Sequence, residues 1–495
     1  MEILVPHDRN PPVPPDRIAS ANRLPLRADG EFVLYWMIAH RRPHWNHALQ
    51  QAVARAVELN KPLVVCEYLR SGHLWSCDRL HRLMIEGMAV NRAAFARSSA
   101  HYLPYVEARA GDGAGFLRPL VARACCVIAD EFPCYVHPRM VANLAAEAPC
   151  LVETVDANGL LPLRATAAAH HRAVDFRRTL QKTLRPHLGH FPAADPLRSA
   201  RLPRLTPDQL PNGSDPDELL KDGLAQLPID HTVGPVALHG GFVAARAQLD
   251  AFLDQRLGRY ADERSTLVDS AASGLSPWLH LGHISAHEVV QAVWERTAWT
   301  PDRLGSATRG SKDGWWNASP AADAFLDELV TWRELGHHFA FHRPDYAEFS
   351  SLPVWAKTTL DQHRGDRREH LYTREQFETA STHDELWNAA QRQLRSEGFI
   401  HNYLRMLWGK KVIEWSATPE EAWATLDQLN NRWAVDGCNP NSWSGIAWCF
   451  GRFDRSWAPQ RPIFGSIRWM SSDNTRRKMN VKPYLARWSG MFATA

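Results

Sequence analysis

The sequence predicts an α/β domain with a parallel sheet, followed in the same chain by a mostly α-helical domain. Three observations support this division. Short apolar runs rich in β-forming residues alternate with helical stretches from residue 31 to about residue 165. A polar, proline-rich stretch without periodicity covers residues 183–217. Beyond residue 240 the pattern is helical, with no strand-like alternation. Strands that alternate with helices favour a parallel sheet covered on both faces.

The elements of the first half follow from these runs. Apolar stretches predict buried strands at residues 32–37, 63–68, 124–129 and 151–155. Helical periodicity marks residues 47–59 and about 78–97. The prolines and charges before residue 29 favour a flexible arm. We therefore expect a flexible arm over residues 1–28, an α/β domain over 29–170, an interdomain linker over 171–234 and a helical domain over 235–495.

Capping signals mark the helix starts of the second half. Capping boxes are formed by Ser285 with Glu288, Thr382 with Glu385, and Thr418 with Glu421. Ser319 and Pro320 open a further helix, in which apolar residues recur at helical spacing as far as Phe339.

Composition excludes several classes of protein. No run of about 18 apolar residues exists, so no membrane span is predicted. The first 17 residues carry charges and five prolines instead of the apolar core of a signal peptide, which indicates a cytoplasmic protein. The eight cysteines are irregularly spaced without a CxxC pair, which favours buried thiols over disulfides or zinc ligands. A net charge of +3 permits nucleic-acid binding without requiring it.

Two stretches of the helical half have residue types that suit a ligand. Small and hydroxylated residues at 270–276 lead into a helix, and such a start suits a phosphate group as well as an ordinary cap. Glu328 and Trp332 are four residues apart and share a helical face. That pair alone is more typical of a core tryptophan beside a solvated carboxylate.

Tryptophans are the most unusual feature, with 20 in the chain. Trp408 and Trp415 are seven residues apart, which places them on one helical face about 10 Å apart along the axis. Trp387 lies on the preceding helix. Spacing alone is more typical of core packing than of a special function. Histidine pairs such as His337 and His338 lack a carboxylate or cysteine to complete a metal site, so no metal is expected.

Four segments, at residues 274–285, 325–335, 382–415 and 429–448, carry a family resemblance. They read GLSPWLHLGHIS, FLDELVTWREL, a long stretch from THDELW to KKVIEW, and LNNRWAVDGCNPNSWSGIAW, which continues into FGSIRWM. In this order they resemble the class II branch of the photolyase/cryptochrome family. The match covers most of 240–490 and, more loosely, the strands of 31–160. It implies a Rossmann-like antenna domain followed by a helical FAD-binding domain.

The resemblance implies FAD as the cofactor. Arg405 and Asp436 then form an ion pair beside the isoalloxazine, and Asn430 faces flavin N5. Gly274 stands where many relatives carry a larger polar residue, and Ser442 stands where glycine is commoner. The cofactor-binding residues implied are Tyr260, Ser273, Gly274, Leu275, Ser276, Arg333, Arg405, Asn430, Asp436 and Gly437.

The resemblance also assigns the catalytic residues. An electron relay runs from Trp408, nearest the cofactor, through Trp387 to Trp415 at the surface. Glu328 hydrogen-bonds the damaged bases, which requires a protonated carboxyl if it acts as a donor. The catalytic residues implied are Glu328, Asn430, Trp387, Trp408 and Trp415.

DNA is the partner implied. Trp332 and Trp448 form two flat walls for a flipped lesion, and Met406 packs on a base. The basic, aromatic stretch from Arg452 to Lys478 suits phosphate contacts, although such runs are usually solvated faces. The DNA-binding residues implied are Glu328, Trp332, Met406, Trp448, Arg455, Trp457 and Arg468.

These assignments predict a light-dependent enzyme that repairs cyclobutane pyrimidine dimers in UV-damaged DNA, acting as a monomer. The alternatives are a cryptochrome-like photosensor, a photolyase for another pyrimidine lesion, and a flavin-free DNA-binding protein on the same scaffold. A second antenna chromophore, a deazaflavin or a folate, is a further possibility that these residues leave open.

Overall fold

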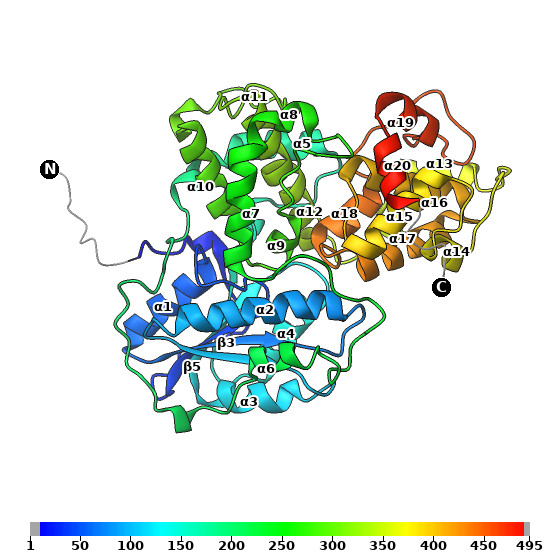
Figure 1. The fold of residues 1–495 in the computed structure, drawn as a ribbon. Helices are drawn as coiled ribbons and strands as arrows, with labels where there is room; N and C mark the ends of the chain where they lie inside the picture. The colour runs from blue at the N-terminus through cyan, green and yellow to red at the C-terminus, as the bar shows by residue number, and fades with distance from the viewer. Residues whose placement is uncertain (1–9, 490–495) are drawn as a thin grey trace. The chain divides into compact units, whose positions relative to one another are not determined.

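A six-stranded sheet organises the first half of the chain in the computed structural model, which describes residues 10–489. The strands are β1 (Ile18–Ser20), β2 (Phe32–Met37), β3 (Leu63–Leu69), β4 (His101–Val106), β5 (Ala124–Glu131) and β6 (Leu151–Asp156). Their order is β1-β6-β5-β2-β3-β4, and all neighbours are parallel except β1 and β6. Figure 1 shows this sheet between helices. The predicted parallel sheet and its four predicted strands are confirmed.

Alternate side chains of the central strand β2 pack on opposite faces of the sheet. Val33, Tyr35 and Met37 pack in one cluster with α1 (His47–Leu59) and the end of α2 (Asp78–Phe95). The intervening residues, such as Leu34 and Trp36, pack in a second cluster with α3 (Gly113–Arg123) and α4 (His137–Glu147). The continuous apolar runs seen in the sequence follow from this burial on both faces.

Two edge strands lie outside the sequence prediction. β4 contains Pro104, which a strand tolerates at an edge, and only part of it is buried. β1 falls inside the predicted flexible arm. There Arg17 is buried, and its guanidinium donates to the carbonyl of Leu160 at 2.6 Å. The arm prediction is therefore wrong from about residue 13 to residue 20, and its first nine residues lie outside the described part of the chain.

By its contacts the chain divides into two units, each of them discontinuous. Unit 1 holds the chain up to Thr166 together with Thr183–Asp250 and Leu275–Pro301. Unit 2 holds Ala167–Lys182, Ala251–Gly274 and the chain from Asp302 onward. Most of the segment predicted as a linker packs on unit 1, because Leu197, Ala200 and Leu202 join the apolar cluster of its sheet. Asp215 in the same segment pairs with Arg92 of α2 at 2.9 Å.

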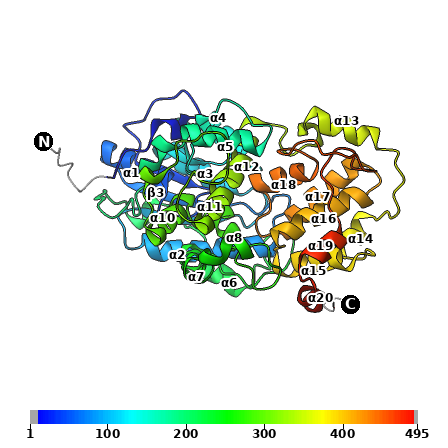
Figure 2. The same cartoon turned by 90° about the horizontal axis from the view of Figure 1, so that it is seen from above.

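Helices build the rest of the chain. Those near the domain boundaries are α5 (Ala173–Thr183), α6 (Pro216–Lys221), α7 (Phe242–Gln255), α8 (Tyr260–Glu263), α9 (Ser276–His280) and α10 (Ala286–Thr297). Unit 2 continues with α11 (Pro320–Leu326), α12 (Arg333–His342), α13 (Val354–Gln362), α14 (Arg374–Glu378), α15 (Glu385–Glu397) and α16 (Asn402–Trp415). It ends with α17 (Pro419–Trp433), α18 (Pro440–Cys449), α19 (Ser472–Lys478) and α20 (Lys482–Trp488). Helices α15 to α18 pack side by side (Figure 2).

Three of the four predicted helix starts are confirmed. Ser285, Ser319 and Thr418 each accept a backbone N–H with their hydroxyl group. The prediction for Thr382 is wrong, because Asp384 caps α15 by accepting from two backbone amides. The helix predicted from Pro320 to Phe339 is interrupted by a π-helical segment, η7 (Asp327–Trp332), between α11 and α12. Such wide turns often occur at functional sites.

Candidate functional site

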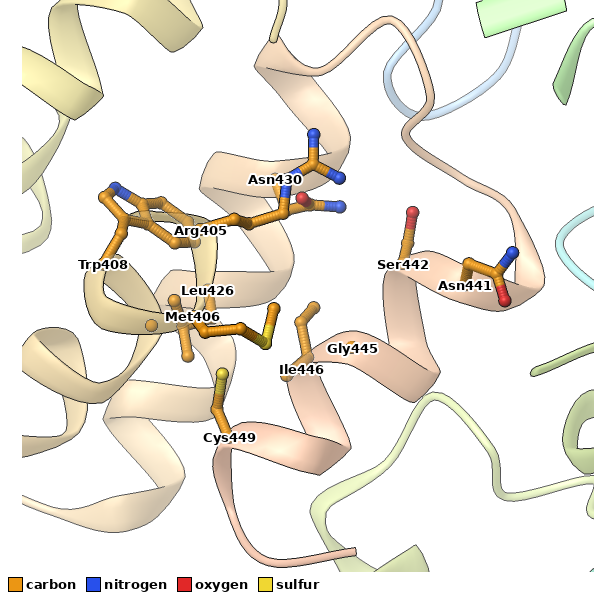
Figure 3. A pocket seen from close by; sticks show the side chains of 11 residues that line it. Arg405, Met406, Trp408, Leu426, Asn430, Asn441, Ser442, Gly445, Ile446 and Cys449 are labelled. Carbon is orange, nitrogen blue, oxygen red and sulfur yellow. The ribbon is translucent and has the colours of Figure 1, made fainter. Parts of the chain in front are cut away.

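Helices α16, α17 and α18 of unit 2 enclose a pocket. Polar side chains at one end and apolar ones at the other distinguish its two parts (Figure 3). Arg405, Asn430 and Ser442 form the polar end, and Met406 and Ile446 belong to the apolar end. The whole lining is Arg405, Met406, Trp408, Gly409, Leu426, Asn430, Asn441, Ser442, Gly445, Ile446 and Cys449. A cavity of this kind suits a flat ring system with one hydrogen-bonding edge.

An ion pair lies at the polar end. The Arg405 guanidinium donates to Asp436 at 3.0 Å, and both side chains are largely buried. The Nε atom of Arg405 is buried without a hydrogen-bond partner among residues 10–489. Ser442 donates its hydroxyl to the carbonyl of Asp436 at 3.2 Å, so the serine fixes the turn that carries the carboxylate. A cationic donor with one unused N–H fits a ligand with an acceptor edge.

Asn430 lines the same end and is buried. Its amide lies 3.4 Å from Asn431 Oδ1, a weak contact that leaves most of its hydrogen-bonding capacity for the pocket. Asn431 in turn accepts from the Cys438 amide at 2.8 Å and thereby holds the loop after α17. Gly437 lies in this loop, where a Cβ atom would stand about 3.0 Å from the carbonyl oxygens of Ala434 and Asn431.

Three tryptophans form a continuous row that starts at the pocket. Trp408 lines the pocket, and its ring stacks on Trp387 with centroids 6.3 Å apart and 6° between the planes. Trp387 lies edge-on to Trp415, with centroids 6.2 Å apart. Hydrogen bonds hold the first two rings: Trp408 Nε1 donates to Gln391 at 2.9 Å, and Trp387 Nε1 donates to the Trp408 carbonyl at 3.0 Å.

The row ends differently from the prediction. Trp415 was expected at the surface, yet only 3% of it is exposed. Tyr372 and His383 pack against its ring at centroid distances of 5.8 and 4.9 Å and cover it. The sequence signals of α16 place the tryptophan on the correct helix face but contain nothing about the loop that shields it.

Glu328 lies in the π-helical segment and forms an ion pair that the sequence did not predict. Its carboxylate accepts from Arg264 at 2.7 Å, and both side chains are about one third exposed. Burial raises the pKa of Glu328, and the nearby Arg264 opposes that rise. The Arg264 guanidinium also stands over the ring of Tyr260 at 5.6 Å. Glu328 therefore sits in an environment that brings protonation closer to neutral pH.

The residues expected to seat a diphosphate fall in both units. Tyr260 is buried in unit 2, edge-on to Phe252 and Phe325. Ser273 and Gly274 follow it in the chain, and Gly274 has a φ of +69°, a conformation that explains a glycine there. Leu275 and Ser276 belong to unit 1 and open the short helix α9.

Helix α12 joins the π-helical segment to the pocket region. It packs against α18, and the two helices come so close that a Cβ atom on Gly336 would collide with Asn441. Arg333, predicted for cofactor binding, is the first residue of α12 and is half-buried. Trp332 ends the π-helical segment beside it and is also half-buried.

Cations and aromatic rings alternate at the C-terminal end of α18 and beyond. The ring of Trp448 lies 5.0 Å from Lys410 Nζ and 5.9 Å from the Arg468 guanidinium. Arg468 also stands 4.8 Å from the ring of Trp457, and Arg455 stands 4.4 Å from the same ring. Both arginines are exposed. We call Trp448, Trp457, Arg455 and Arg468 the arginine–tryptophan cluster.

Two basic residues near this cluster, Arg452 and Lys410, are buried and do not belong to its exposed surface. Arg452 is 2% exposed, stands over Phe339 and donates to the carbonyl of Ser351 at 2.6 Å, so it serves the core. Lys410 is also buried and donates to the Cys449 carbonyl. Burial lowers the pKa of Lys410 to about 8.

The residues that sequence reasoning missed are Arg264, Gln391 and Lys410. Arg264 is 64 positions from Glu328, so no local spacing reveals the pair. Gln391 lies four residues after Trp387 on α15, and a search for polar residues at that spacing would have found it.

Other features of the described chain bear on the expected ligands. All eight cysteines are buried and free, as predicted. Within residues 10–489, no three His, Cys, Asp or Glu side chains cluster as a metal site. The helices of that range include none that is long and apolar enough to span a membrane.

Comparisons with individual proteins all point to photolyases, although no protein-family model matches the chain. A deoxyribodipyrimidine photo-lyase of Methanothermobacter thermautotrophicus is 30% identical over 96% of this chain and 98% of its own length. The protein of the same name from Oryza sativa subsp. japonica is 33% identical over 92% of this chain and 87% of its own length. Among solved structures, a class III photolyase from Agrobacterium tumefaciens shares the fold, with a TM-score of 0.68 at 18% identity, covering 93% of this chain and 86% of that one.

Proposed function

The chain belongs to the photolyase/cryptochrome family, and on that premise we propose that it repairs cyclobutane pyrimidine dimers in DNA by light-driven electron transfer from reduced FAD. We assign it to the class II branch. One observation carries the proposal: the pocket lined by Arg405 and Asn430 is also lined by Trp408, the first of three tryptophans whose successive ring centroids are 6.3 and 6.2 Å apart.

The pocket at α16–α18 is the proposed seat of the flavin ring. FAD, when bound, supplies light absorption and a transferable electron. The Arg405 guanidinium, held by Asp436, favours a negatively charged ring, because its charge is largely removed from water. The Asn430 amide can donate or accept, so it can serve a ring nitrogen in either protonation state. Tyr260, Ser273, Gly274, Leu275, Ser276, Arg333 and Gly437 complete the proposed cofactor site.

The tryptophan row is the proposed route by which the oxidised cofactor is returned to its reduced form. The rings of Trp408 and Trp387 are almost parallel, with centroids 6.3 Å apart, and their indole N–H groups are both held by hydrogen bonds. Burial excludes water from all three rings and keeps the intervening medium apolar.

Lesion binding is assigned to the π-helical segment and to the end of α18. Glu328 is the proposed donor to the damaged bases, since its raised pKa favours a protonated carboxyl. Trp332, Met406 and Trp448 supply flat or soft apolar surfaces for a base turned out of the duplex. A dimer already stacks poorly, so turning it out costs less than turning out an undamaged base.

The arginine–tryptophan cluster is the proposed contact with the DNA backbone. Arg455 and Arg468 are exposed, and their guanidinium carbons lie 4.4 and 4.8 Å from the centre of the Trp457 ring, a contact that restricts both side chains. Pre-positioned cations of this kind suit phosphate groups, because less side-chain freedom is lost on binding.

The decisive experiment is repair by the purified protein. Its absorption spectrum is recorded first, and the reduced protein is then illuminated with DNA that contains a thymine cyclobutane dimer. Loss of the dimer in the light but not in the dark supports the proposal. A yellow, photoreducible protein that leaves the dimer intact supports a photosensor or another lesion, and a colourless protein that still binds DNA supports the flavin-free alternative.

A further inference from the structure

The outer end of the tryptophan row is closed by a tyrosine–histidine pair. Tyr372 lies in the segment before α14 and His383 in the segment before α15. Both rings contact Trp415, edge-on, at centroid distances of 5.8 and 4.9 Å. The Tyr372 backbone amide also donates to the Trp415 carbonyl at 3.1 Å, which fixes the two residues to each other.

The hydroxyl group of Tyr372 makes two hydrogen bonds, both to His383. The backbone N–H of His383 donates to the phenolic oxygen at 2.9 Å. The Nδ1 atom of the same histidine lies 2.7 Å from that oxygen and is the only acceptor for the phenolic hydrogen among residues 10–489. A phenol so placed has an imidazole nitrogen positioned to receive its proton.

We propose that Tyr372 is the terminal electron donor of the row and that His383 takes up its proton. This inference rests on the proposed function, because the row must first be oxidised by light. An electron passes from Tyr372 to the Trp415 radical cation, and the phenolic proton moves to His383 Nδ1. The products are neutral Trp415, a neutral tyrosyl radical and a histidine imidazolium. A soluble thiol then gives a hydrogen atom to the tyrosyl oxygen, and the imidazolium returns its proton to solvent.

The proton acceptor matters because a phenol that loses an electron becomes a strong acid. Oxidation without a base would leave a high-energy radical cation, whereas transfer across a 2.7 Å hydrogen bond avoids that state. Tyr372 is half-exposed, unlike Trp415, so a soluble reductant can reach it. The pair therefore links a buried row to solvent.

The surroundings of His383 keep its ring neutral. Partial burial lowers the pKa of His383, and His370, stacked on it at 3.7 Å, lowers it further. The other charged groups that act on it are Asp384, Lys411 and Glu369. A histidine with a lowered pKa is neutral at pH 7 and can accept a proton there. Acid conditions protonate His383 in advance and remove the acceptor.

Flash spectroscopy on the flavin-loaded protein tests the inference. In the wild type we expect a tryptophan radical that gives way to a tyrosyl radical, more slowly in D₂O than in H₂O. In Tyr372→Phe, which keeps the ring but lacks the hydroxyl, we expect a longer-lived tryptophan radical, no tyrosyl radical and no solvent isotope effect. His383→Gln should retain the tyrosine but slow its oxidation. Tyr346→Phe is the matched control, since Tyr346 packs on Trp443 and not on the row.

A readout that does not involve the flavin checks the hydrogen bond itself. In ¹⁵N-histidine NMR of the wild type, we expect His383 Nδ1 to carry the shift of an accepting nitrogen, and Tyr372→Phe to move it. An unmoved signal, or a wild type that forms a tryptophan radical but no tyrosyl radical, overturns this inference and leaves the proposed function standing. A wild type that binds flavin but forms no tryptophan radical overturns the relay and this inference with it, whereas the proposed repair function fails only if the reduced protein leaves the dimer intact in the light.

Discussion

Trp387 and Trp408 stack almost in parallel, with 6° between their ring planes, although they lie on different helices 21 residues apart in sequence. The stacking depends on α15 and α16 packing against each other. The Trp387 indole donates to the Trp408 carbonyl, so one contact sets both the separation and the orientation of the rings.

Replacing Trp408 tests the row at the pocket. Trp408→Phe should abolish most photoreduction of oxidised flavin while leaving repair by chemically reduced protein close to the wild-type rate. Trp423→Phe is a matched control, because Trp423 is buried on α17 and hydrogen-bonds only to a backbone carbonyl away from the row. Photoreduction that persists in Trp408→Phe contradicts the relay.

Asn430 should tune the cofactor. Asn430→Leu keeps a side chain of similar size but removes the amide from the polar end of the pocket. Loss of a hydrogen bond to a charged ring, about 1.5–3 kcal/mol, corresponds to a shift of roughly 60 to 130 mV in a one-electron potential. Redox titration followed by absorbance measures this shift. Identical spectra throughout the titration speak against a contact with the ring.

Arg264 should control the protonation of Glu328. Removing an adjacent guanidinium raises the pKa of a carboxyl group by about 1 to 3, because the charged form loses its partner. Arg264→Met should therefore raise the pKa of Glu328 further and shift the alkaline limit of dimer binding upward. Infrared detection of the carboxyl band against pH measures the pKa, and Glu328→Gln identifies the band. No change on removing Arg264 refutes the ion pair.

The exposed arginines should carry the salt dependence of DNA binding. Arg455→Ala should weaken binding to damaged duplex and reduce the magnitude of the salt slope by about 1, since one phosphate contact is lost. Arg118→Ala, an exposed arginine paired with Glu147 in unit 1, is the control and should leave the slope unchanged. Equal salt slopes of DNA binding for both variants would show that Arg455 does not contact a phosphate group.

Lys410 should give the protein a distinct stability profile above neutral pH. The unfolded chain keeps a proton on this lysine up to about pH 10.5, whereas the folded chain releases it near pH 8. Unfolding therefore takes up a proton between these values, and the free energy of unfolding rises with pH there, by about 3 kcal/mol from this group. The cost of burying the charge is fully present below pH 8.

The matching variant is Lys410→Met, which lacks that rise. Urea unfolding at about pH 7.5 and about pH 10 gives the difference between wild type and variant at each pH. We expect the free energy of unfolding of the wild type to rise relative to that of the variant by about 2.4 kcal/mol between the two conditions. Parallel profiles would contradict a buried, neutralised lysine.

Local patterns predicted much of the fold. The four buried strands and the helix over 47–59 appear as expected, because continuous apolar runs and helical periodicity are set by neighbouring residues. The two edge strands were missed for the same reason. β1 has three residues and β4 contains Pro104, and an edge strand needs fewer apolar residues than a central one.

The sequence by itself determined which helices carry the tryptophans, the Glu328 segment and the basic stretch. Helix faces and caps depend on residues three and four positions apart, so the sequence contains them directly. Only the tertiary structure decided which residues meet. Arg264 reaches Glu328, Arg405 reaches Asp436, and Tyr372 covers Trp415, across separations that no periodicity encodes. Contacts of this kind depend on how whole helices pack, and packing is a property of the complete chain.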